Sequence, residues 1–167
     1  MGISTHIRRG HPITFGLIIL FGLLELALSA WLTAHFASLH NQRSAAERDR
    51  VSLALFSSSW TVVLSSLILA LFWHSADGSV LTSVLAHLVF LGCTWLLWTA
   101  TATSVTALLG GGLDCKLQDT FVYCNQLNAL EAFAWIEWLL VTFAIVVVLV
   151  RGIVAARRGD GYRGALV

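Results

Sequence analysis

The residues with the most evident chemistry in this sequence are two cysteines in the polar stretch 113–126, LDCKLQDTFVYCNQ. Eight residues separate Cys115 from Cys124, and such a pair can form a redox site, a metal site or a disulfide. A redox pair is typically Cys-x-x-Cys, which this spacing does not match. A zinc site needs two more ligands, and the nearest histidine, His40, lies on another predicted loop. The spacing therefore favours a disulfide, with two free thiols as the alternative.

Two glutamates lie where a membrane protein has few ionisable groups. Glu25 falls near the middle of the first long apolar segment, Glu137 falls at a similar depth in the fourth, and His87 lies about two turns inside the third. Residues of this kind are functional candidates, so the glutamates suggest a proton-coupled or cation-binding site. The alternative is a packing role, with both carboxyls neutral or bonded to Ser and Thr of neighbouring helices. We favour packing, because no Lys or Arg lies within the apolar segments.

The start of the fourth segment, NALEAFAWIEWLLVTF, carries a carboxyl and two large rings on one face. Glu131, Trp135 and Trp138 follow the i, i+4, i+7 spacing of a helix. We interpret this face as a stripe that anchors the helix at the membrane interface. Two alternatives are a groove for a sterol or acyl chain and contact with another helix. The three residues are therefore candidates for lipid contact.

Hydroxyl residues recur in the second and third segments at helical spacing. Thr99 and Thr103 form one such set, and Ser57, Thr61 and Ser65 form another. Small and hydroxylated residues let membrane helices approach closely and bond across the contact. We therefore expect close packing of these helices. Cys93, also in the third segment, is expected to be a small packing residue.

The composition places these residues in a membrane protein. Of 167 residues, 57% are hydrophobic and 11% are charged, whereas soluble domains are about a quarter charged. Four apolar segments reach the ~20 residues that a spanning helix needs. They are Ile13–Phe36, Val51–Trp73, Val80–Leu109 and Leu127–Val150. The prediction is an all-α protein with a bundle of four transmembrane helices.

The predicted organisation is a head (1–12), one four-helix domain (13–151) and a basic tail (152–167). Pro12 suits a helix start, and the glycines at 110–112 are expected to end the third helix. Six Lys or Arg residues lie on the side of both termini and four on the other side, which favours cytoplasmic termini. The cysteine pair is then outside, where disulfides persist.

The chain lacks the motifs of the common enzyme classes. It has no glycine-rich phosphate loop, no His-Glu-x-x-His and no nucleophile elbow. An enzyme is therefore not expected. The net charge of +1 gives no reason to expect a nucleic-acid partner.

Four helices, a first loop with His and Arg, a short second loop and a Cys-bearing third loop leading into CNQLNALEAFAWIEWLL resemble the fungal MARVEL-domain membrane proteins. The resemblance extends from about Pro12 to Arg151. It implies a non-enzymatic role in organising or shaping membrane, as lateral domains, vesicles or curved arrays. It also implies membrane lipids and further copies of the chain as partners, a bound sterol or phospholipid in place of a catalytic cofactor, and residence in the plasma membrane or secretory-pathway vesicles.

A second hypothesis comes from another functional class. A small proton- or cation-coupled transporter or channel would use Glu25 and Glu137 within the membrane. Loss of flux on neutralising Glu25 would distinguish it from a membrane organiser.

Overall fold

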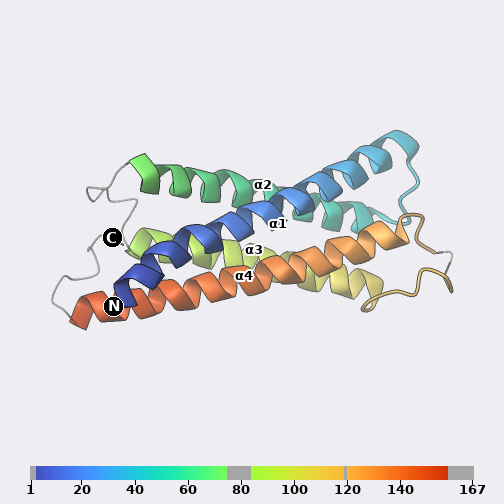
Figure 1. Cartoon of the computed structure of the whole chain (residues 1–167). Helices are drawn as coiled ribbons and strands as arrows, with labels where there is room; N and C mark the ends of the chain where they lie inside the picture. The colour runs from blue at the N-terminus through green and yellow to red at the C-terminus, as the bar shows by residue number, and fades with distance from the viewer. Residues whose placement is uncertain (1–2, 75–83, 119, 158–167) are drawn as a thin grey trace.

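The chain forms a bundle of four antiparallel helices (Figure 1). The computed structural model describes residues 3–74, 84–118 and 120–157. The helices are α1 (Ile3–Leu39), α2 (Ala45–His74), α3 (Val84–Leu109) and α4 (Cys124–Arg157). Each contains a stretch long and apolar enough to cross a membrane: Ile13–Leu39, Ala45–Ala70, Leu85–Leu109 and Cys124–Ile153. The predicted class, an all-α protein with four membrane-spanning helices, is confirmed.

The helix α2 starts at a capping motif that the pattern of apolar residues does not reveal. The helix begins at Ala45, six residues before the predicted Val51, because Ser44 caps it. The Glu47 N–H donates to Ser44 Oγ at 3.2 Å, and the Arg43 N–H donates to Glu47 Oε2 at 2.6 Å. This is a variant of the Ser-x-x-Glu capping box. The sequence Ser44-Ala-Ala-Glu47 is its signature, so the start was predictable.

The first helix also differs from the prediction. It begins at Ile3, so Pro12 lies inside it and most of the predicted head (1–12) is helical. Pro12 has no N–H to donate to the carbonyl of Arg8, a loss that membrane helices tolerate. At the other end of the chain, α4 continues through Arg157 into the predicted tail. Residues 158–167 and the predicted start of the third helix at 80–83 lie outside the described residues.

The helices α1 and α3 are both followed by residues in the left-handed backbone conformation. His40 has φ 50° and its N–H donates to the Phe36 carbonyl at 3.1 Å, which ends α1. Gly110 and Gly111 have φ 74° and 93°, and both N–H groups donate to the Thr106 carbonyl. Glycine reaches these angles without steric cost. The predicted stop of the third helix is confirmed.

The core consists of two apolar clusters and a polar layer near the middle of the bundle. Along α1, Ile18 belongs to one cluster, Leu32 belongs to the other, and Glu25 lies between them. The layer contains fully buried polar side chains from all four helices. They are Glu25, Ser29, Ser57, Ser58, Thr61, Ser65, Thr101 and Glu137. Because lipid surrounds the bundle, polar groups must find their partners inside it.

Tryptophan–threonine hydrogen bonds join α3 to its two neighbours. Five indole N–H groups donate to threonine hydroxyls at 2.9–3.2 Å, each across a helix contact. The pairs are Trp60–Thr94, Trp98–Thr61, Trp95–Thr142, Trp138–Thr99 and Trp135–Thr106. The predicted bonding across the contacts of hydroxyl-rich helices is therefore present, with indole donors that the spacing of Ser and Thr alone does not indicate. The predicted close packing of α2 with α3 is not, because this pair has the least extensive packing of the four principal helix contacts. Thr103 differs, since it is exposed and donates to Thr99 within its own helix.

The close approach of α1 to α2 and α4 depends on Gly22. A Cβ at this position would stand 3.0 Å from Val62 Cγ2 and 3.4 Å from Glu137 Oε1, whereas a Cβ at Gly16 would meet nothing within 4 Å. We expect Gly22→Ala to destabilise the bundle by about 1–3 kcal/mol through overpacking. Gly16→Ala is the control and should be neutral or slightly stabilising, because Ala is the better helix former. Thermal unfolding in detergent compares them, and equal melting temperatures for the two variants would contradict this account.

Candidate functional site

The centre of the polar layer is formed by two carboxyls from α1 and α4. Glu25 and Glu137 are both fully buried, and each lies near the middle of its membrane-spanning stretch. The Glu137 carboxyl points to α1, since its Oε1 lies 3.4 Å from the position that a Cβ on Gly22 would take. Gly22 is about one helical turn from Glu25. The structure thus brings together the pair that sequence depth matched.

Neither carboxyl has a hydrogen bond within the described part of the chain. All four oxygens of Glu25 and Glu137 are buried and without a hydrogen-bond partner there. Bonds from Ser and Thr of neighbouring helices, one of the two forms of the packing interpretation, are absent among the described residues. The other form, two neutral carboxyls, stays a prediction. An unsatisfied buried polar group costs about 1–3 kcal/mol. The two side chains are therefore candidates for a functional role.

Most hydroxyls of the polar layer do not donate to the carboxyls because they donate to other groups. A hydroxyl has one hydrogen to donate, and most of these donate to their own helix backbone. Ser29 donates to the Glu25 carbonyl, Ser58 to the Ala54 carbonyl and Thr61 to the Ser57 carbonyl, at 2.7–2.8 Å. Ser57 and Thr101 bond each other at 2.9 Å. Ser65 Oγ is buried and has no partner among the described residues.

His87, the third polar residue predicted at depth, does not join the pair. It is buried in α3, and its ring meets the edge of Phe15 with ring centroids 6.1 Å apart. Phe15 is ten residues before Glu25, a distance of about 15 Å along a helix. His87 therefore belongs to a separate part of the bundle interior.

The face of Glu131, Trp135 and Trp138 turns to α3. Thr106 donates to Glu131 Oε1 at 2.7 Å and accepts the Trp135 indole N–H at 3.0 Å. Trp138 donates to Thr99 at 2.9 Å and is half-buried. The Glu131 side chain is buried against α3, so it does not contact headgroups or water as the interfacial interpretation expected. Helix contact, the alternative named last for this face, describes most of it, and Trp135 alone keeps a substantial exposed surface, at 36%.

The loop between α3 and α4 is closed by the predicted disulfide. Cys115 and Cys124 are bonded, with their Cα atoms 5.7 Å apart. Asn128 of α4 holds the same loop, since its side-chain oxygen accepts the Leu113 N–H and its amide donates to the Leu113 carbonyl. Asn41 donates to the Tyr123 hydroxyl at 3.0 Å, which ties this loop to the one between α1 and α2.

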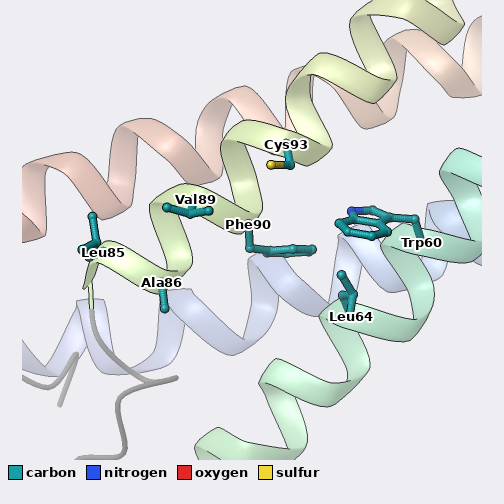
Figure 2. A pocket seen from close by; sticks show the side chains of 7 residues that line it. All are labelled: Trp60, Leu64, Leu85, Ala86, Val89, Phe90 and Cys93. Carbon is teal, nitrogen blue, oxygen red and sulfur yellow. The ribbon is translucent and has the colours of Figure 1, made fainter.

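An apolar groove lies on the outer surface between α2 and α3. Its volume is about 470 Å³. Figure 2 shows its lining, with Phe90 of α3 and both Trp60 and Leu64 of α2 facing the space between the helices. The other lining residues are Leu85, Ala86, Val89 and Cys93. A second hollow of about 410 Å³ shares Trp60 and Cys93 with it. Cys93 is exposed here, so the expectation that it packs inside the bundle is wrong.

Fold and site together define a four-span membrane protein with a buried carboxyl pair and a surface groove open to lipid. No protein-family model matches the chain, no curated protein matches it, and no solved structure matches it. The MARVEL resemblance therefore stays a prediction. The arguments about function below depend on the geometry of the site and the groove.

The disulfide gives a direct test of the outer loop. Closing a short loop stabilises a fold by about 2–3 kcal/mol in the chain-entropy account, so Cys115→Ser should lower the free energy of unfolding by this amount. Cys93→Ser, which removes the exposed free thiol, is the matched control and should leave stability unchanged. Mass spectrometry after alkylation without reductant should find one modified cysteine in the native protein. Three modified cysteines would show that the disulfide does not form in the membrane.

Proposed function

We propose that this chain is a non-enzymatic membrane protein that organises or shapes the membrane through lipid contacts and self-association. The observation that supports the proposal is the apolar groove between α2 and α3. Its lining residues are on the outside of a bundle that turns its polar side chains inward. A groove of this size suits an acyl chain or a sterol ring system, which are the ligands that a surrounding bilayer supplies.

The partners follow from the same surface. Many of the exposed side chains along the spans are large and apolar, including Val89 in the groove and Phe56 and Leu96 beside it. In a bilayer such a surface has lipid tails and other helices as its available partners. We propose lipids and further copies of the chain, with termini in the cytoplasm and residence in the plasma membrane or secretory vesicles. The charge count supports this sidedness, and the disulfide fits an outer loop.

Filling the groove tests the proposal. Val89 is 60% exposed within it, and Val89→Trp places an indole where a lipid would bind. We expect the purified protein to retain less sterol or phospholipid in native mass spectrometry. We also expect fewer clusters of fluorescently labelled protein in giant vesicles.

The matched control for this experiment is Val146→Trp. Val146 is 52% exposed on α4, outside the groove. This variant should retain lipid and cluster as the native protein does. If Val89→Trp and Val146→Trp both match the native protein in the two measurements, the groove is not the lipid site and the proposal loses its support.

A second function, proton- or cation-coupled transport, is favoured by one specific observation. Glu25 and Glu137 are buried carboxyls with no hydrogen bond among the described residues, which is a costly arrangement for a protein whose only role is to pack. We expect Glu25→Gln to abolish ion flux driven by a pH gradient in proteoliposomes. Glu131→Gln, which can keep its bond from Thr106, is the control. Native protein with no flux above that of empty liposomes would remove the transport proposal and leave the organiser proposal untouched. Flux that persists unchanged in Glu25→Gln would contradict transport through the carboxyl pair.

A further inference from the structure

The two carboxyls of Glu25 and Glu137 are buried ionisable groups that the hydrogen bonds of the bundle do not involve. Glu25 of α1 and Glu137 of α4 are each fully buried, and the Glu137 carboxyl reaches the turn of α1 that carries Gly22. Their four oxygens and the Ser65 hydroxyl are buried without a partner among the described residues. These unpaired acceptors point to a ligand rather than to packing, because native proteins satisfy almost all buried polar atoms.

The chemistry of the donor set identifies the ligand class. Every unpaired group here is a carboxyl or hydroxyl oxygen, and oxygen ligands select hard cations. Zinc and other metals that prefer nitrogen or sulfur are not supported, since no third His, Cys, Asp or Glu joins the pair among the described residues. Calcium takes six to eight oxygen ligands, more than two carboxyls supply. A monovalent cation makes a smaller demand.

Charge balance sets how such a cation enters. The basic residues of the spanning stretches, Arg48, Arg50 and Arg151, lie near the ends of those stretches, whereas the pair lies near the middle. An uncompensated carboxylate is costly at this depth. Two protonated carboxyls are neutral, and so is one monovalent cation together with one proton. Exchange between these two states conserves charge in the site: one cation enters, and one proton leaves to water.

We propose that Glu25 and Glu137 form a binding site for a monovalent alkali cation, which enters in exchange for one of the protons that the pair otherwise holds. Thr61 and Val62 of α2 approach the same turn of α1, the one that carries Gly22. The inference deepens the second function proposed above. Binding is measured without a gradient, so its failure and the failure of transport are distinguishable.

Other titratable groups lie away from the pair. On α4, Glu131 is six residues before Glu137 and is bonded by Thr106. On α3, His87 lies near Phe15, about 15 Å along α1 from Glu25. On α2, Glu47 is in the first turn and accepts the Arg43 N–H. Proton release that depends on both Glu25 and Glu137 is therefore assigned to the pair.

The test uses the full chain in lipid nanodiscs in weakly buffered solution with a pH indicator. Sodium or potassium chloride is added, and choline chloride at equal ionic strength controls for salt effects. We expect about one proton released per chain with a small cation and none with choline. Infrared spectra should show loss of one protonated-carboxyl band in parallel. Glu25→Gln and Glu137→Gln should each lose the response, and Glu131→Gln should retain it.

Three outcomes would overturn the inference. The first is no proton release with sodium or potassium in folded native protein. The second is release only with calcium or magnesium, which would contradict a monovalent site. The third is an undiminished response in either glutamine variant. If a glutamine variant fails to fold by circular dichroism, Glu25→Asp replaces it and should shift the half-saturating cation concentration. Cation binding without flux in proteoliposomes would retain the site and remove transport.

Discussion

The constraint on which the rest of this bundle depends is that a side-chain hydroxyl has one hydrogen to donate. The hydrocarbon of a bilayer offers no hydrogen-bond partner to a polar group, so each hydroxyl must donate its hydrogen to an acceptor inside the protein. Thr61, Thr94, Thr99 and Thr142 donate theirs to the carbonyl four residues earlier. Their lone pairs then remain free to accept an indole N–H from the next helix. The contacts of α3 with α2 and α4 are built from this arrangement, which is directional and fixes the rotation of each helix.

The same constraint explains the buried carboxyls. Because the hydroxyls of Ser29, Ser58 and Thr61 are already committed to their own backbones, they cannot donate to Glu25 or Glu137. A layer that looks polar enough to solvate two carboxyls is therefore poor in available donors. The consequence is a local environment that favours a neutral pair or a pair balanced by a cation. Packing of α1 allows the approach, since Gly22 leaves room for the Glu137 side chain.

Much of the fold was predictable from the sequence, and the failures have physical causes. Continuous apolar length indicated four spans, and the glycines at 110–112 indicated the end of α3. The start of α2 was missed because hydropathy does not register the Ser44–Glu47 cap, although the motif is legible in the sequence. The position of each residue within its apolar segment placed Glu25 level with Glu137, because all the spanning helices cross the same hydrocarbon core. The rotation of each helix was not predictable in this way, so Glu131 and Cys93 were assigned to the wrong surroundings: one is buried against α3, and the other is exposed at the groove.

The groove and the bundle interior that holds the carboxyl pair are reached from consecutive residues of α2, which point about 100° apart around the helix. Trp60 lines the groove and donates to Thr94, whereas Thr61 faces inward, accepts from Trp98 and lies near Gly22. A helix is stiff over one residue, so a change in the rotation of α2 moves both side chains. α2 and α3 also have the least extensive packing among the four principal helix contacts, and polar bonds supply much of what holds them together there. A lipid that widened this contact would strain the Trp98–Thr61 bond beside the carboxyls. The two functions proposed for the chain are thus physically connected through α2.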